Sequence, residues 1–241
     1  AEQVVFAPAF VDTPTPTLEV TPTPIIEIPI TETPIIIETP TVTPFNTDTP
    51  TSVPPPFYTE EFNGNLANWI EFMSSGDPQM VEKRVDAGRL SISLLPLDDK
   101  LPWFYLINDS FVYSNVKVET LVTNRGPNTT YFSTVCRYSD IGWYEFVLSS
   151  SGAFTVYAVD SVGLVNQGYN ELASGVTPIF NSGMSTNVIP VECKGSELNL
   201  YVNQTLVQSV IDTKFNFAQG KIGLAVSSPE KLSVNVDFES L

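Results

Sequence analysis

Residues 135–159, VCRYSDIGWYEFVLSSSGAFTVYAV, decide the fold. Within and just before this stretch, three runs are rich in aromatic and β-branched residues, in a pattern that repeats every two residues: 131–138, 143–148 and 153–159. Serine and glycine, which favour turns, lie at 150–152 between the second and third runs. This pattern predicts three consecutive β-strands.

The same pattern continues on both sides of this stretch. Further strand-like runs are residues 89–95, 115–123, 197–203, 221–226 and 232–238. Turn signals separate them, including Ser-Gly-Asp-Pro at 75–78 and Asn-Arg-Gly-Pro at 124–127. No long window has the apolar stripe of a helix. We therefore expect an all-β, two-sheet sandwich of about a dozen strands.

The chain divides by composition into two parts. Residues 1–56 hold 13 of the 20 prolines, 13 threonines and seven acidic residues, and no Lys, Arg or Gly. Residues 57–241 hold all 11 basic residues, both cysteines and all three tryptophans. The second part is long enough to bury a full hydrophobic core, whereas the first is not. We expect an extended Thr/Pro-rich arm, residues 1–56, followed by one globular domain, residues 57–241.

The content of ionisable residues argues against several classes of function. The net charge of −16 disfavours binding to nucleic acid or anionic lipid. Because the chain has no histidine, Ser-His-Asp and Cys-His catalysis and histidine-ligated zinc are excluded. No stretch approaches 18 apolar residues, so we expect no membrane span. We interpret the chain as the mature form of a secreted, extracellular protein.

Eight Thr-Pro dipeptides mark the arm. Proline removes a backbone donor and biases the preceding residue toward extended conformations, so we expect extended or polyproline II backbone. Such composition is typical of glycosylated stalks on secreted proteins. The threonines of the dipeptides, and three Asn-x-Ser/Thr sequons of the domain, are candidate glycosylation sites: Thr13, Thr15, Thr21, Thr23, Thr33, Thr39, Thr43, Thr49, Asn108, Asn128 and Asn203.

A stalk does not explain the apolar centre of the arm. Seven isoleucines lie within thirteen residues: Ile25, Ile26, Ile28, Ile30, Ile35, Ile36 and Ile37. Leaving them all in water forgoes on the order of 10 kcal/mol of burial energy, and their β-branched runs suit an edge strand. The first functional hypothesis is therefore a non-enzymatic extracellular structural protein. In it, the arm docks on a neighbouring copy of the chain and builds a filament or surface layer.

Several short segments of the domain resemble a known family. They are Cys-Arg-Tyr at 136–138, Trp143-Tyr144, Cys193 with Gly195, Leu-Tyr-Val-Asn at 200–203 and Gly-Lys-Ile-Gly-Leu at 220–224. With them, residues 57–241 resemble the concanavalin A-like (laminin-G-like) jelly-roll domains of bacterial secreted proteins. The resemblance implies two stacked antiparallel sheets with adjacent first and last strands, the first lying in EEFNGNLANW (60–69). The family commonly has glycine at the position of Gln204. Because glutamine replaces it here, a type I′ turn is less favourable.

This family includes lectins, adhesins, structural domains and glycosidases, so the fold does not decide the function. The second hypothesis is a cell-surface, lectin-like carbohydrate-binding module on a glycosylated stalk. Trp103, Trp143 and Tyr144 are candidate glycan contacts, because sugar-binding sites stack pyranose rings on exposed aromatic residues. The alternative is that these residues, like Trp69, belong to the core or its rim. Trp143 and Tyr144 are neighbours in one strand, so they face opposite sides of the sheet.

The two cysteines, Cys136 and Cys193, both lie in predicted strands. In a chain of secreted composition we expect a disulfide between them, with two buried thiols as the alternative. Domains of the family that the chain resembles pair equivalent positions, which supports the disulfide. Neither cysteine has the surroundings of a catalytic thiol.

The acidic residues give no catalytic pattern. The alternating E-x-D-x-E strand motif of the family's hydrolases is absent, so we expect no enzymatic activity and no catalytic residue. Asp237 and Glu239 are the nearest imitation, and they suit a solvated or cation-binding pair better. If the first and last strands pair, Glu60, Glu61 and Asp237 would offer oxygen ligands for Ca²⁺, and no other cofactor is expected.

Overall fold

The computed structural model describes residues 54–55, 57–95, 101–127, 129–162, 168–228, 230 and 233–241. The isoleucines and threonines named above in the arm, and the sequon at Asn128, lie outside the described residues. The predictions that concern them therefore stay predictions. Within the described residues, no helix is long and apolar enough to cross a membrane.

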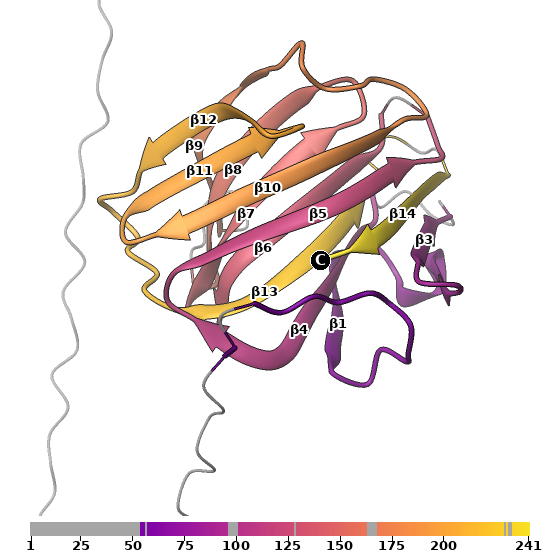
Figure 1. The fold of residues 1–241 in the computed structure, drawn as a ribbon, viewed down its shortest axis with the longest axis horizontal. Coiled ribbons are helices and arrows are strands. Elements are labelled where there is room, and N and C mark those ends of the chain that lie inside the picture. Colours follow the sequence, from indigo (N-terminus) through magenta and orange to yellow (C-terminus); the bar gives the residue numbers. More distant parts are fainter. Residues whose placement is uncertain are drawn as a thin grey trace, which may run out of the picture. The chain divides into compact units, whose positions relative to one another are not determined.

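The described residues form two seven-stranded antiparallel sheets that pack face to face (Figure 1). Sheet A consists, in spatial order, of β1 (Trp69–Ser75), β4 (Trp103–Tyr113), β13 (Gly220–Ser227), β6 (Tyr131–Ser139), β7 (Gly142–Ser149), β8 (Ala153–Asp160) and β9 (Tyr169–Val176). Sheet B consists of β12 (Thr205–Ile211), β11 (Glu197–Val202), β10 (Thr186–Lys194), β5 (Val116–Asn124), β14 (Val234–Ser240), β3 (Leu90–Leu94) and β2 (Val81–Val85). This is the predicted all-β jelly-roll sandwich.

The main hydrophobic core lies between the sheets. In β3, for example, Leu90, Ile92 and Leu94 are fully buried while the two intervening serines are only partly so. The period of two seen in the sequence therefore marks which residues face the core. Strand β7 is different, because all eight of its residues are buried, so both of its faces are covered.

The opening segment differs from its expected form. Residues 60–68 are not a strand, and β1 begins only at Trp69. Glu60 nevertheless exchanges two backbone hydrogen bonds with Leu241, at 2.8 and 3.1 Å. The expected adjacency of the first and last strands is therefore wrong: β1 lies in sheet A and β14 in sheet B, and only Glu60, before β1, meets the last residue of the domain.

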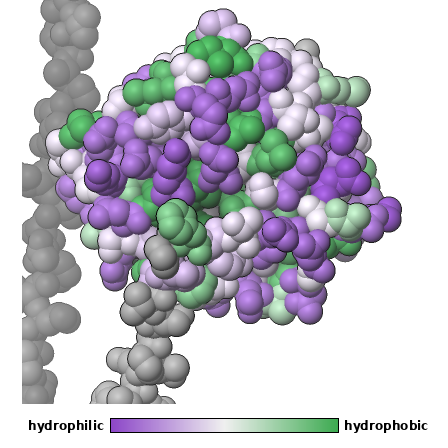
Figure 2. Space-filling model, in the orientation of Figure 1, coloured by the Kyte–Doolittle hydropathy of each residue, from purple (hydrophilic) through white to green (hydrophobic). Residues whose placement is uncertain are grey.

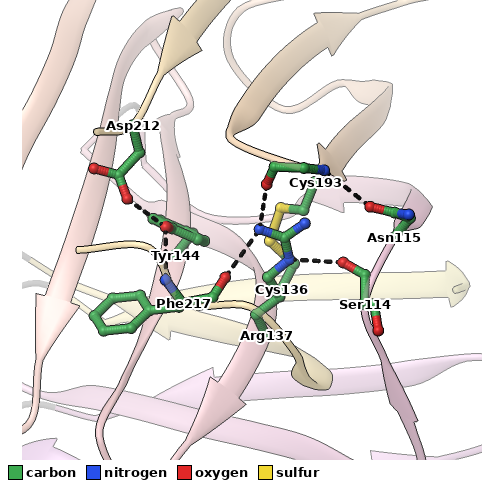
Figure 3. The surroundings of a disulfide bond; sticks show 9 residues. Ser114, Asn115, Cys136, Arg137, Tyr144, Cys193, Asp212 and Phe217 are labelled. Atoms are coloured by element: carbon green, nitrogen blue, oxygen red, sulfur yellow. Dashed lines mark hydrogen bonds between the residues drawn. A yellow bond between two sulfur atoms is a disulfide. The ribbon is translucent and has the colours of Figure 1, made fainter. Parts of the chain in front are cut away.

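The predicted disulfide is present and connects the two sheets (Figure 3). Cys136 lies in β6 of sheet A, and Cys193 lies in β10 of sheet B. Next to it, the buried Arg137 side chain donates hydrogen bonds to three backbone carbonyls from three different connections, those of Ser114, Gly195 and Phe217, at 2.7–2.9 Å. The Cys-Arg pair therefore fixes three loops at one end of the sandwich.

We predict that the double substitution Cys136→Ala with Cys193→Ala lowers the free energy of unfolding by about 4 kcal/mol, because the bridge closes a 57-residue loop in the unfolded chain. Urea unfolding of the variant and the oxidised wild type measures the difference. Reduced wild-type protein should match the variant. Equal unfolding midpoints for the oxidised wild type and the variant would contradict the prediction.

The hairpin between β11 and β12 overturns the expectation for Gln204. Val202 pairs with Thr205, so the loop has only two residues. Both have positive φ, +48° at Asn203 and +68° at Gln204. Two left-handed residues in a two-residue loop are the mark of a type I′ turn, which the sequence argument had disfavoured because glycine is missing.

Side-chain contacts hold this turn in place without glycine. Asn203 tolerates left-handed backbone, and its amide accepts the backbone N–H of Val188 and donates to the carbonyl of Ile179, both at 3.0 Å. The Gln204 amide reaches the Glu119 carboxylate at 3.1 Å on the exposed surface. These contacts offset the cost of about 1–2 kcal/mol that a residue with a Cβ meets in this conformation.

We predict that Gln204→Gly raises the free energy of unfolding by about 0.5–1 kcal/mol, since glycine adopts positive φ without strain. Urea unfolding provides the measurement. Gln208→Gly, inside β12, is the matched control and should lower stability by a similar amount. A destabilising Gln204→Gly would show that the turn does not strain residue 204.

Candidate functional site

Aromatic side chains gather on the face of sheet A that points away from sheet B. Side chains alternate across a strand, so the residues that flank the core-facing ones line this outer side. We call this surface the aromatic face and define it by its rings: Phe72, Trp103, Tyr105, Tyr138, Trp143, Tyr157 and Tyr169. They come from β1, β4, β6, β7, β8 and β9, so the rings extend across the sheet.

The rings of the aromatic face pack on one another in stacked and edge-on pairs. Tyr105 is stacked on Phe72, with ring centroids 4.7 Å apart, and is nearly parallel to Trp103 at 6.5 Å. Trp143 meets Tyr105 edge-on at 5.8 Å. Such geometries are the favoured ones for aromatic pairs, so the face has a defined arrangement of rings.

The outer face of sheet B has a different character. In Figure 2, drawn from the side of sheet B, hydrophilic side chains cover most of the surface in view. Lys117 and Glu119 of β5 are exposed there. The concentration of aromatic rings is therefore a property of sheet A.

The carboxyl of Glu145 lies beneath these rings. Glu145 is in the centre of β7, opposite Tyr157 of β8, and its exposed fraction is 0%. Its oxygens accept hydrogen bonds from the indole N–H of Trp103 at 3.2 Å, the indole N–H of Trp143 at 3.3 Å and the hydroxyl of Tyr105 at 2.7 Å. Tyr105 in turn shares a hydrogen bond with Tyr169. One acid therefore organises the polar atoms of four aromatic residues.

Burial governs the electrostatics of this cluster. Removal from water raises the pKa of Glu145, and the hydrogen bonds from Tyr105, Ser133, Trp143 and Trp103 oppose that rise without cancelling it. Burial likewise raises the pKa of Tyr105 well above its usual value, with a further contribution from the charge of Glu145. Both tyrosine and tryptophan donors are therefore available to this acid throughout the physiological pH range.

A shallow pocket of about 130 Å³ opens on the aromatic face beside Glu145. It is lined by Trp103, Tyr131, Val147, Ser149, Ala153, Phe154, Thr155 and Tyr157. The lining has aromatic rings and hydroxyl groups and no charged side chain. Stacking surfaces with hydroxyl donors and acceptors suit a neutral polar ligand with apolar faces.

Two larger pockets lie elsewhere in the described part of the domain. One of about 610 Å³ is lined by residues near Phe57, Tyr113 and Leu241, and includes Lys117 and Glu119. The other, of about 360 Å³, lies between the edge strands β9 and β12. The second pocket includes Tyr169 of the aromatic face, but neither pocket is lined by Trp103 or Tyr157, so size alone does not identify the candidate site.

The structure separates the aromatic residues that the sequence singled out. Trp103 and Trp143 both lie on the aromatic face, and Trp103 also lines the pocket. Tyr144 points the opposite way, into the core, where its hydroxyl donates to Asp212 and accepts the backbone N–H of Phe217 (Figure 3). It is 1% exposed, so the structure removes it as a glycan contact. Trp69 is a core residue, as the alternative interpretation had it.

Neither described sequon has an asparagine amide that is both exposed and free of hydrogen bonds. Asn108 is buried in β4, and its amide oxygen accepts the backbone N–H of Ser110. The amide of Asn203 is occupied within the hairpin turn described above. Glycosylation at these two residues is therefore not supported by their surroundings.

The acids considered for Ca²⁺ are not brought together. Asp237 is paired with Arg125 at 2.9 Å and with Arg89 at 3.7 Å. The carboxylate of Glu60 accepts the backbone N–H of Phe62, and Glu61 binds Asn63. Among the described residues, no group of three or more acidic or cysteine side chains could hold a metal ion. Calcium binding stays a prediction without support from these contacts.

Sequence reasoning missed Glu145, Tyr105, Tyr157 and Tyr169. Glu145 lies within an otherwise apolar strand, WYEFVL, and an acid there on the same side as Trp143 was the available signal. It has no acidic neighbour two residues away, so it does not match the pattern of paired acids. The residues around Glu145 come from β4, β6, β7, β8 and β9. They meet only because of the order of strands in sheet A, which the sequence does not show.

We predict that Glu145→Gln becomes more stable relative to the wild type as the pH rises from 4 to 8. Because the folded state raises the pKa of Glu145, it holds this proton more tightly than the unfolded chain does. Wild-type stability must then fall as the pH rises from the unfolded pKa through the folded one, and glutamine removes that loss. Urea unfolding at each pH gives the difference, and a difference independent of pH would contradict the prediction.

No family model matches the chain, and no curated protein matches it. Solved structures do. A glycoside hydrolase family 16 endo-glucanase from Bacteroides ovatus aligns with a TM-score of 0.57 at 8% identity, over 76% of this chain and 98% of that one. A β-1,3-1,4-glucanase (lichenase) from a mouse hindgut metagenome gives 0.55 at 12%, over 76% and 96%. A Bacillus subtilis protein of unknown function with a galectin-like fold gives 0.51 at 10%, over 76% and 94%.

These likenesses correct two expectations. The interpretation as a filament or surface-layer subunit is wrong: two of these similar structures are glucanases, and none of the three is described as a filament or surface-layer protein. The expectation of no enzymatic activity is wrong as well, because glucanases share this fold. At these identities the comparison establishes the fold alone: the domain is a concanavalin A-like jelly-roll sandwich.

Proposed function

We propose that this domain binds a neutral glycan of the β-glucan class on the aromatic face of sheet A. The observation that carries the proposal is the uncharged pocket that is lined by Trp103, Tyr131 and Tyr157 together with small and apolar side chains. Two of the similar structures are glucanases, which suggests the ligand class, and the chemistry of the lining agrees with it.

Ring stacking would supply most of the affinity. A pyranose has an apolar face of axial hydrogens that packs well against an aromatic ring. Trp103 and Tyr157 are half-buried, so they keep ring surface available to a ligand while the rest of each side chain is held by its neighbours. Burying this surface against a sugar gains roughly 25 cal/mol per Å² of apolar area.

Hydroxyl groups in the lining would set the orientation of the sugar. Tyr131, Thr155 and Tyr157 are partly exposed and carry hydroxyls, each of which can donate and accept a hydrogen bond. The Ser149 hydroxyl is buried and already bonded to Ser151 and to the backbone N–H of Ala153. A neutral sugar meets no desolvated charge in this lining, whereas an anionic one would be repelled by a chain of net charge −16. The proposal is therefore restricted to uncharged glycans.

Glucan hydrolysis is the second candidate function, and Glu145 is the observation that favours it. A carboxyl with a raised pKa is the usual form of a general acid in glycoside cleavage. In this structure the aromatic rings cover Glu145 completely, so hydrolysis would require them to move. Release of reducing sugar from a β-glucan, lost in Glu145→Gln, would favour this candidate over simple binding.

The disulfide supports an extracellular location for this activity. Disulfides persist in oxidising compartments, and Cys136–Cys193 is buried in the core of the sandwich. Secretion and display at a cell surface are part of the proposal, as is a glycan partner in the surroundings.

We predict that Trp103→Ala and Tyr157→Ala each weaken binding to laminarin or mixed-linkage β-glucan by about 30-fold, which corresponds to about 2 kcal/mol of lost stacking and burial. Isothermal titration calorimetry provides the affinities. Tyr201→Ala, a half-buried tyrosine on the outer face of sheet B, is the matched control and should bind as the wild type does. Equal losses in all three variants would contradict a site on sheet A.

A further inference from the structure

Glu145 lies directly behind a wall of the pocket. Its carboxyl accepts the indole N–H of Trp103, which lines the pocket, and also that of Trp143. With an exposed fraction of 0%, Glu145 itself cannot touch a ligand that lies over the rings. Any effect that it has on binding in this conformation must pass through the aromatic side chains.

A packing role does not account for an acid at this position. Among the described ion pairs none includes Glu145, so its burial is not offset by a cation. The neighbouring outward positions, Val135 on β6 and Val147 on β7, are apolar. A leucine at 145 would avoid the desolvation cost of the carboxyl. What the carboxyl adds is an acceptor for two indole N–H groups at once.

We propose that Glu145 is a positioning residue that holds the Trp103 indole in the orientation on which a sugar ring stacks. The proposal rests on the glycan-binding function proposed above and names the group that prepares its main contact. Trp103 is otherwise restrained by Tyr105 and Tyr169, whose rings lie 6.5 and 5.3 Å away. A ring fixed before binding loses less conformational entropy when the ligand arrives, which strengthens binding.

The first arm of the test needs no ligand. Exchange of the indole N–H protons with solvent, followed by NMR, reports how firmly each tryptophan is held, and Trp103→Phe identifies the Trp103 signal. We expect slow exchange at Trp103 in the wild type and fast exchange in Glu145→Leu. Glu145→Gln keeps one acceptor oxygen and should restore most of the protection. Glu171→Gln, an exposed acid on β9, is the matched control and should change nothing.

The second arm measures affinity for laminarin by calorimetry. Glu145→Leu should weaken binding about fivefold to tenfold, the cost of ordering one large side chain on binding. Glu145→Gln should lose threefold or less by the same reasoning. Trp103→Phe keeps a ring but has no N–H, so it should lose about as much as Glu145→Leu. In the Trp103→Phe background, Glu145→Leu should then add little further loss, because both changes remove the same contact.

Each outcome decides the matter. Loss of protection together with non-additive loss of affinity supports the proposal. Unchanged protection of Trp103 in Glu145→Leu overturns it, even if that variant binds poorly. Fully additive losses also overturn it, because Glu145 would then act independently of Trp103. If the wild type binds none of the neutral glucans while Trp103 is protected through Glu145, the proposed function is overturned, and the positioning role in glycan binding is overturned with it.

Discussion

Strand β7 must be covered on both of its faces, and this constraint organises the domain. One side of β7 sends Tyr144, Phe146 and Leu148 into the core between the sheets. The other side carries Trp143 and Glu145, which would be exposed on a bare sheet. The aromatic rings of the neighbouring strands cover them and form a second, smaller hydrophobic cluster on the outer side of sheet A. The fold and the candidate site therefore share a strand.

The buried carboxyl of Glu145 orients the aromatic side chains of this second cluster, because it accepts hydrogen bonds from three of them. An apolar residue at 145 would leave the two indoles and the Tyr105 hydroxyl without their common acceptor, whereas the carboxyl accepts the N–H groups of Trp103 and Trp143. The disulfide joins β6 to β10 of the other sheet, and the Arg137 hydrogen bonds fix three loops, two of which connect the sheets. Glu145 therefore holds the indole rings of the aromatic face, and the disulfide holds strand β6 of the same sheet. A binding surface needs such a rigid support.

Local pattern predicted the fold well and the site poorly. Alternation in the sequence located strands such as 153–159, and the Cys136–Cys193 pair followed from strand context and the family resemblance. The aromatic face was inaccessible to this reasoning, because Trp103 and Glu145 are 42 residues apart and meet only through the strand order of sheet A. The turn at Gln204 was misjudged for a related reason: the contacts of Asn203 with Val188 outweigh a local backbone preference.

The central claim is that the aromatic face of sheet A is the ligand surface. The most direct measurement is a backbone and side-chain NMR titration of the disulfide-bonded protein with a laminarin oligosaccharide. The account predicts chemical-shift changes confined to the pocket lining, strongest at Trp103, Tyr131 and Tyr157. Changes confined to the larger pocket near Phe57 and Tyr113, or to the outer face of sheet B, would place the ligand elsewhere and contradict it.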